Sequence, residues 1–442
     1  ITGSLTLAAP SAVNFNNGAT GGGTIGGALT GSTTTLTIGP VSVGSYTPQG
    51  AVTGISNLVV TNGTFTNTLH PVTVATAIST AAAGTITLNN ILTGAATVNN
   101  AGNLNIDFIN ALTATGALTN TGTLSITKAY TPTSSAFTTS GTININSGGI
   151  FTKPATFTNT GITKIDGTGT INGAYTGGAG SSLIIGPTTS TTSYTTTGTI
   201  AGVETITVQK GLFTVANAVS GAINFNISSG AKAVLNAVVT GTGAVTNAGT
   251  LTFNTAAALA SFASLTNTGS LNIAANFTVP ATLTNTGAVY VYSTSATIPT
   301  AIAITGTLSG GSVGSLHIGR DNTLSTNYLA TSFTTTQTIT NMPTIHLYAG
   351  NFTANNAISG VTNFTIDPDN TTTSGTTPTS FNLNAQITGI GTSASPTLIN
   401  AGTMSIGVNN PFVDGDANKW VISNSGSLTL NNPLDLSNAN TN

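Results

Sequence analysis

Residues 100–126 read NAGNLNIDFINALTATGALTNTGTLSI and contain the same short motif twice. In each copy Asn, then Ala or Thr, then Gly is followed by two aliphatic residues with one polar residue between them. The aliphatic pairs are Leu104 and Ile106, then Leu124 and Ile126. Residues two apart on a β-strand point to the same side. The stretch therefore predicts two strands, each with one apolar and one polar face.

The motif recurs along the chain at a nearly constant spacing. Its glycines are Gly102, Gly122, Gly141, Gly161, Gly249, Gly269, Gly287, Gly402 and Gly426. The first four lie 20, 19 and 20 apart, and Gly249, Gly269 and Gly287 lie 20 and 18 apart. A repeat of this length is typical of one coil of a parallel β-helix, in which stacked coils make the core continuous. We therefore predict an all-β protein, a parallel β-helix (β-solenoid) with coils of about 20 residues.

The motif also predicts which side chains lie inside. We expect the apolar positions to point inward in stacked columns: Leu104, Ile106, Leu124, Ile126, Leu251, Phe253, Leu271, Ile273, Met404 and Ile406. Gly is expected to supply a positive φ where the chain turns a corner. Asn tolerates the left-handed conformation and, stacked above Asn in the next coil, forms an amide ladder.

A longer period lies above the short one. Residues 35–40, 182–187 and 315–320 align, as do residues 63–66, 211–214 and 350–353. The chain is therefore expected to hold three tandem blocks, residues 1–168 with an N-terminal coil, 169–305 and 306–442. No linker composition separates them, so they are expected to form one continuous rod of roughly 22 coils and about 100 Å. Three β-sandwiches are the alternative, which the constant phase of the motif disfavours.

The composition excludes several classes of protein. Charged residues make up 4% of the 442 positions, against about 25% in a typical soluble protein. The hydrophobic fraction of 39% and the net charge of −2 are unlike those of disordered chains. Seven Lys and Arg make no basic patch for nucleic acid, and no apolar run is long enough for a transmembrane segment. There is no Cys, and the start at Ile1 suggests a removed signal peptide or a fragment.

The motif in this Thr-, Asn- and Gly-rich, Cys-free background resembles the passenger regions of bacterial autotransporters and filamentous-haemagglutinin-like adhesins. The resemblance covers most of the chain and implies a right-handed parallel β-helix exported to the bacterial cell surface. It also implies secretion, hence an extracellular or cell-surface location. Two departures are the missing C-terminal membrane barrel and the low charge.

Candidate catalytic and metal-binding residues are sparse. The carboxylates are Asp107, Asp166, Glu204, Asp321, Asp367, Asp369, Asp414, Asp416 and Asp435. Most lie more than two coils apart, and Asp321 beside Arg320 suggests a surface pair, so we expect no enzyme and no cofactor. His70, His317 and His346 are too scattered to suggest a metal site, and His317 is expected to be a solvated surface residue.

Two acidic turns, residues 367–370 and 414–418, place Asp and Asn oxygens at alternating positions. Asp367 and Asp369, or Asp414 and Asp416, could surround Ca²⁺, but a polar turn is the favoured interpretation. Trp420, Phe412, Tyr290 and Tyr292 are expected in the core or in a cap rather than on a sugar-binding surface.

Three functions remain open. The first is a non-enzymatic extracellular structural protein that self-assembles into a filament or surface layer, because its uncharged faces do not repel one another. The second is an adhesin passenger or stalk that binds host or cell-surface glycans, although we find no insertion longer than about fifteen residues. Ice binding would need Thr-x-Thr in every coil, and the outward pairs vary. Residues 3–10 match residues 426–433, so both ends resemble interior coils. Either the chain is cut from a longer repeat protein, or its ends stack head to tail through Leu5 and Leu428, which is the favoured interpretation.

Overall fold

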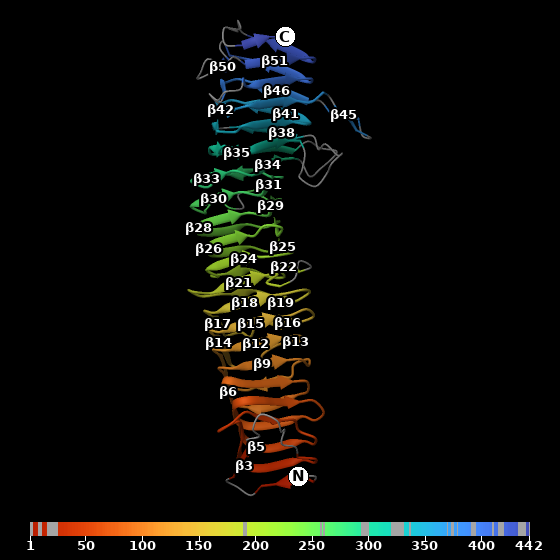
Figure 1. The fold of residues 1–442 in the computed structure, drawn as a ribbon, viewed down its shortest axis with the longest axis vertical. Coiled ribbons are helices and arrows are strands. Elements are labelled where there is room, and N and C mark those ends of the chain that lie inside the picture. Colours follow the sequence, from red (N-terminus) through yellow and green to blue (C-terminus); the bar gives the residue numbers. More distant parts are fainter. Residues whose placement is uncertain are drawn as a thin grey trace. The chain divides into compact units, whose positions relative to one another are not determined.

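The structure is a computed structural model, and it divides into two compact units, Ile1–Ser220 and Gly221–Asn442. It describes residues 3–7, 11–15, 25–188, 192–256, 259, 261–292, 300–319, 331–335, 337–368, 370–372, 375–377, 379–389, 395–408, 411–413, 420–431 and 439–441. Throughout these residues the regular structure is β-strand, with no helix. Each unit is a parallel β-helix, as the sequence predicted, with successive coils one above another (Figure 1).

The first unit has three strands in each coil, and equivalent strands of successive coils pair in parallel. Three long strands run around more than one side of the coil: β3 (Leu29–Ile38), β5 (Val52–Asn67) and β6 (Val72–Leu88). The first column adds β1 (Leu5–Thr6), β7 (Leu92–Ala95) and β10 (Leu112–Ala114) to them. The second adds β2 (Ala12–Phe15), β8 (Thr97–Asn100), β11 (Ala117–Asn120), β14 (Ala136–Thr139) and β17 (Phe157–Asn159).

The third column contains the strand after the Asn-x-Gly motif. It comprises β4 (Gly44–Tyr46), β5, β6, β9 (Asn103–Ile106), β12 (Thr123–Ile126), β15 (Thr142–Ile145), β18 (Ile162–Ile165), β21 (Ser182–Ile185) and β24 (Thr205–Val208). Shorter pairings complete the later coils: β13 (Ala129–Tyr130) with β16 (Ile150–Thr152) and β19 (Thr170–Asn172), β20 (Tyr175–Thr176) with β23 (Ile200–Ala201), and β22 (Ser193–Thr195) with β25 (Leu212–Val215). β26 (Val219–Ile227) begins at the end of this unit.

The second unit also has three columns. The longest contains β27 (Lys232–Leu235), β29 (Thr250–Phe253), β31 (Ser270–Ile273), β34 (Ala288–Val291), β37 (Ser315–Ile318), β40 (Thr344–Leu347), β43 (Asn363–Ile366), β48 (Thr397–Asn400), β51 (Trp420–Asn424) and β53 (Ala439–Thr441). Another comprises β32 (Phe277–Thr278), β35 (Thr300–Thr305), β38 (Thr331–Thr335), β41 (Gly350–Ala354), β46 (Thr379–Leu383), β49 (Thr403–Ile406) and β52 (Ser427–Leu430).

The remaining strands of the second unit form a third column and one hairpin. The column includes β28 (Val239–Asn247), β30 (Ser264–Asn267) and β33 (Thr282–Asn285), then β36 (Leu308–Ser309), β39 (Ile339–Thr340), β42 (Ile358–Val361), β47 (Ile387–Gly389) and β50 (Phe412–Val413). The hairpin consists of β44 (Asn370–Thr372) and β45 (Gly375–Thr377). These two strands pair antiparallel, whereas the other described pairings are parallel. It projects away from the stacked coils (Figure 1).

The inward columns are those that the motif predicted. Leu104 pairs with Leu124 and Ile106 with Ile126 in register, and Met404 and Ile406 pair with Leu428 and Leu430. All ten residues expected inside are buried, with at most 2% of their surface exposed. The prediction of the core register is confirmed, because alternation on each strand carries every second side chain to the inside.

The role predicted for the motif glycines is wrong. None of them has a positive φ. A β-carbon on Gly122 would instead lie 2.1 Å from the carbonyl oxygen of Gly102, and one on Gly141 would lie 2.1 Å from that of Gly122. Glycine is therefore required because the backbones of successive coils approach closely at this corner.

Glycines of the longer repeat do have the left-handed conformation. Gly39 and Gly186 each follow a strand with φ of 67°, and a β-carbon on either would collide with the carbonyl oxygen of Asn62 or Lys210, one coil later. The two strands belong to different columns of the first unit, since residues 35–38 pair with β5 in the second column and β21 pairs with β24 in the third. The long repeat is thus not a whole number of coils.

The described strands make about 18 turns, fewer than the number expected from the repeat length. Several coils of the second unit are longer than the sequence motif predicts. Leu316 pairs with Ile345, and Phe364 pairs with Leu398. In the second of these coils the described β44–β45 hairpin lies between β43 and β46, and the strands on either side still pair in register with their neighbours.

Candidate functional site

Four features of the described residues stand out from the repeated pattern: a hollow lined by hydroxyl groups, buried amide ladders, an outward column of aromatic rings and the charged corners. The hollow lies on the second column of the first unit and has a volume of about 110 Å³. We call it the threonine hollow; it is lined by Thr119, Thr138, Thr139, Ser140, Thr158 and Thr160.

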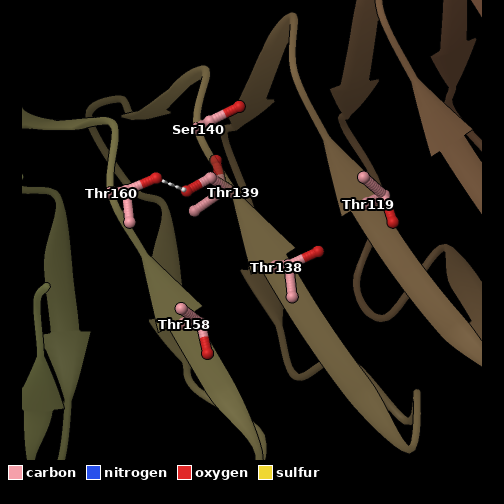
Figure 2. A pocket seen from close by; sticks show the side chains of 6 residues that line it. All are labelled: Thr119, Thr138, Thr139, Ser140, Thr158 and Thr160. Carbon is pink, nitrogen blue, oxygen red and sulfur yellow. Dashed lines mark hydrogen bonds between the residues drawn. The ribbon is translucent and has the colours of Figure 1, made fainter.

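The threonine hollow spans three successive coils. Thr119, Thr138 and Thr158 pair in register on β11, β14 and β17, and Figure 2 shows them on three neighbouring strands, with Ser140 and Thr160 at the turns. Thr139 is buried, and its carbonyl oxygen accepts a hydrogen bond from the Thr160 hydroxyl at 3.4 Å. Thr139 reaches the hollow through its backbone, because its hydroxyl accepts a hydrogen bond from Asn120 in the core. The other threonines contribute methyl and hydroxyl groups, so the hollow is uncharged and has both apolar and polar surface.

The amide ladders run through the core at the Asn-x-Gly corner. In the first unit the Thr80 hydroxyl donates to Asn100 Oδ1 at 2.5 Å, and Asn100 Nδ2 donates to Asn120 Oδ1 at 2.6 Å. In the second, Asn247 donates to Asn267 and Asn267 to Asn285, each at 2.6 Å. The predicted ladder is confirmed, but these asparagines are not left-handed. They end strands, and their side chains point inward.

Asn120 Nδ2 donates to the Thr139 hydroxyl, and Asn159, the register partner of Thr139 in the next coil, contacts a buried tyrosine. Asn159 Nδ2 donates to the Tyr175 hydroxyl oxygen at 2.5 Å, and Thr163 Oγ1 lies 2.5 Å from the same oxygen. Burial raises the pKa of Tyr175 to about 12, and the hydrogen bonds with Thr163 and Asn159 lower it in part. The phenol is neutral at physiological pH, so the ladder is a structural network.

Four aromatic rings stack on the outer face of the second unit. Tyr290 lies on His317 with ring centroids 4.7 Å apart, His317 on Tyr348 at 5.8 Å and Tyr348 on His346 at 3.7 Å, with interplanar angles of 16–26°. His346 Nε2 is 2.8 Å from Asp367 Oδ1. His317 is hydrogen-bonded to Ser315 and to the Tyr348 hydroxyl.

Two predictions about this column are wrong. His317 points outward but is half-buried in a stack rather than solvated, and Tyr290 belongs to the same outer column rather than to the core or a cap. His317 and His346 pair in register across a lengthened coil. Because this coil is longer than the ordinary repeat, the sequence spacing did not predict that the two histidines are neighbours. Trp420, Phe412 and Tyr292 are buried, as expected.

The charged corners do not assemble into a catalytic cluster. Asp107 accepts a hydrogen bond from Thr127 at 2.6 Å, Asp166 accepts one from Thr192 at 3.0 Å, and Glu204 accepts one from the Gly180 backbone at 2.5 Å. His70 lies in a corner of the first unit, half-buried. Across the ranges that the structure describes, no three His, Cys, Asp or Glu residues come together as metal ligands.

Several candidates lie outside the described residues. They are the Arg320–Asp321 pair, Asp369 of the first acidic turn, Asp414 and Asp416 of the second, and Asp435. Asp367, the described member of the first turn, is held by His346. The predicted calcium turns therefore stay predictions.

In the described part of the chain, no helix is long and apolar enough to span a membrane. No protein family, curated protein or solved structure matches the chain. The resemblance to autotransporter passengers and filamentous-haemagglutinin-like adhesins accordingly stays an expectation based on the motif.

Proposed function

We propose that this protein is a non-enzymatic structural component, exported to the bacterial cell surface or medium, that self-assembles into a filament or layer. The proposal rests on the chemistry of the outer faces, which carry uncharged hydroxyl and amide side chains. Hydroxyl and amide side chains pair with one another along the coils, as Asn105 Nδ2 does with Thr87 Oγ1 at 3.1 Å and Asn172 Nδ2 with Thr152 Oγ1 at 3.3 Å. Such surfaces have little charge repulsion to keep copies apart.

Strand β52 offers a second kind of contact. Its Leu428 and Leu430 continue the column of Met404 and Ile406, which are buried, yet 39% and 47% of their own surfaces are exposed. A further coil stacked on β52 would bury both leucines and pair the edge of β52 that no described strand covers. Continuation of the same polypeptide or a second copy would supply such a coil, and the proposed self-assembly assigns it to a second copy.

Association is tested by sedimentation over a range of concentrations, with electron microscopy of the same samples. The wild-type protein is expected to form filaments or layers, and the double variant Leu5→Lys with Leu428→Lys is expected to lose end-to-end growth. Val313→Lys is the matched control, because Val313 is exposed in the same unit but outside β52. A wild-type protein that stays a monomer at high concentration rejects the proposal.

One observation favours a second candidate, an adhesin stalk. The β44–β45 hairpin projects from the second unit (Figure 1), and Asp367 at its base is held by His346. Loops displayed on a rigid scaffold are frequent binding elements. Replacing residues 370–377 by a short Gly-Ser linker should abolish binding to immobilised glycans if this candidate is right, and should leave wild-type behaviour unchanged if the hairpin binds nothing.

A further inference from the structure

The sequence contains three Asn-Gly pairs, and the structure describes two of them. Residues 17–18 lie outside the described part of the chain, residues 62–63 lie within β5, and residues 172–173 lie at the end of β19. Asparagine is a thermolabile residue. It loses its amide most readily before glycine, because glycine has no β-carbon to shield its backbone nitrogen from the preceding side chain. The surroundings of each pair therefore decide whether it reacts in the folded protein.

The pair at residues 62–63 is held inside a sheet. Asn62 is half-buried, and Asn62 and Gly63 pair in register with Ala83 and Gly84 of β6. On the other side Gly63 pairs with Gly44 of β4, and a β-carbon on Gly63 would lie 1.8 Å from the Gly44 carbonyl oxygen. With a strand on each side, the backbone has no room to turn the Gly63 nitrogen toward the Asn62 side chain.

The pair at residues 172–173 lies at an open corner of the first unit. Asn172 is the last residue of β19 and is exposed. Gly173 has φ of 82°, and a β-carbon there would meet no atom within 4 Å. Asn172 Nδ2 donates to Thr152 Oγ1 at 3.3 Å, which is longer than an ordinary hydrogen bond. The Asn172 side chain is therefore weakly held beside open space.

One hydroxyl group of the next coil restrains this corner. The Gly173 backbone N–H donates to Thr197 Oγ1 at 2.8 Å, and the same hydroxyl donates to the Ile171 carbonyl oxygen at 3.0 Å. Thr197 thus links the residues on both sides of Asn172. The bond from Gly173 to Thr197 must open before the Gly173 nitrogen can approach the Asn172 side chain.

We propose that Asn172 is a self-modification site, at which the chain deamidates at a rate controlled by the Thr197 hydroxyl. Once its bond to Thr197 opens, the Gly173 nitrogen loses its proton to water and attacks the side-chain carbonyl carbon of Asn172. A new C–N bond closes a succinimide ring, and the bond to Nδ2 breaks. Nδ2 takes up a proton and leaves as ammonia. Water then adds to either carbonyl of the ring and opens it to aspartate or isoaspartate.

The product differs from the original chain in charge and in backbone length. Each conversion replaces a neutral amide by a carboxylate, in a chain whose formal net charge is −2. The isoaspartate form also adds a methylene group to the backbone at residue 172, where β19 pairs with β16. Copies thereby acquire negative charge with age, and like charges oppose association. The modification itself does not depend on the proposed self-assembly, so the two proposals are tested separately.

The test follows deamidation of the full chain at mildly alkaline pH by peptide mapping and mass spectrometry, which detects the gain of about 1 Da at each Asn-Gly pair. Thr197→Val removes the hydroxyl that holds Gly173. Thr199→Val is the matched control, the same substitution at a nearby position. Both threonines are exposed, so the fold is expected to survive, as circular dichroism will show. A sample unfolded in urea gives the reactivity of both pairs without the fold.

In the folded wild-type protein Asn172 is expected to deamidate and Asn62 to stay intact, whereas in urea the two should react at similar rates. Thr197→Val should raise the rate at Asn172 about fivefold, as expected for the loss of one ordinary hydrogen bond, and Thr199→Val should leave it unchanged. An Asn62 that reacts as fast as Asn172 in the folded protein, or an Asn172 that stays intact there, overturns the modification site. Equal rates in the two threonine variants overturn the control by Thr197.

Discussion

Gly122 illustrates a constraint that acts at the scale of one atom. Its φ is ordinary, and an alanine there would be comfortable in an isolated strand. The obstacle is the preceding coil, whose Gly102 carbonyl oxygen would lie 2.1 Å from the added β-carbon and whose Ala101 carbonyl carbon would lie 2.6 Å from it. Both are backbone atoms, so neither can move aside without displacing a coil.

Gly122→Ala is therefore expected to destabilise the first unit by about 1–3 kcal/mol, as overpacking does in other cores. Gly178→Ala is the matched control, because its β-carbon would meet nothing closer than 3.3 Å. Urea unfolding followed by circular dichroism measures both. Equal free energies of unfolding for the two variants would contradict the close-approach explanation.

The first asparagine of an amide ladder can have a side-chain oxygen that accepts no hydrogen bond. Asn400 Nδ2 donates to Asn424 Oδ1 at 2.6 Å, but Asn400 Oδ1 is buried without a hydrogen bond. Its register partner in the preceding coil is Ile366. In the first unit the corresponding position before Asn100 is Thr80, whose hydroxyl donates a hydrogen bond to Asn100 Oδ1.

Replacing Ile366 by Thr should supply the missing donor. We expect Ile366→Thr to be at least as stable as the isosteric Ile366→Val, whereas a buried threonine without a partner normally costs about 1–3 kcal/mol. The same pair of substitutions at Leu347, whose register partners Ile318 and Ile366 are both apolar, provides the control, and there Val should be the more stable. Free energies of unfolding for the four variants test this prediction. If the Thr variant is less stable than the Val variant by the same amount at both positions, the threonine at position 366 does not supply a hydrogen bond to Asn400.

At the scale of the strand, alternation made the core predictable. Leu271 and Ile273 were placed inside from their spacing alone, and both are fully buried, because a strand with one apolar face has one way to bury it. The glycine constraint was not predictable in the same way. It depends on the distance between coils, which no local sequence pattern expresses.

Pairing between distant strands was predictable only where the coil length stayed constant. Leu251 and Leu271 are separated by one coil of the ordinary length and pair as expected. His317 and His346 pair across a longer coil. The sequence spacing therefore did not predict the outer stack of Tyr290, His317, Tyr348 and His346. Residues inserted between two strands do not change the sequence pattern of those strands, so the pattern does not reveal the length of the coil.

Leu271→Ala tests the packing within one such column. Its neighbours in register, Leu251 and Val289, are also buried, so the truncation opens a cavity and is expected to cost about 2–5 kcal/mol. Hydrogen exchange should show the loss concentrated in β29, β31 and β34, since each coil contacts only its neighbours. Protection lost evenly over the whole second unit would contradict nearest-neighbour stabilisation.

For the molecule as a whole, scarcity of charge governs the response to pH. With so few carboxylates and histidines, folded and unfolded chains bind similar numbers of protons between pH 4 and pH 9, so stability should be nearly constant there. The buried tyrosines change this at higher pH. Burial raises the pKa of Tyr46 to about 12, that of Tyr175 to about 12, and those of Tyr130 and Tyr194 further, from an ordinary value of 10.0.

An unfolded chain loses these protons near pH 10, whereas the folded chain holds them until about pH 12. The stability that neutral phenols contribute is thus complete below pH 10 and is lost as the pH rises from 10 to 12. Free energies of urea unfolding at a series of pH values, with phenolate absorbance recorded in parallel, measure the effect. Free energies of unfolding that stayed constant from pH 10 to pH 12 would contradict this effect. A melting temperature that shifted by tens of degrees between pH 4 and pH 9 would contradict the constancy expected there.

The direction of the hydrogen bonds between coils has a mechanical consequence. Backbone and ladder bonds, such as the one from Asn100 to Asn120, join each coil to the next, so a pull along the stacking direction loads the interfaces of a unit in series. Each interface bears the full force, and the weakest opens first. Under tension a unit should therefore lengthen in a succession of small releases, one coil at a time, and dissipate work at each step instead of rupturing at once.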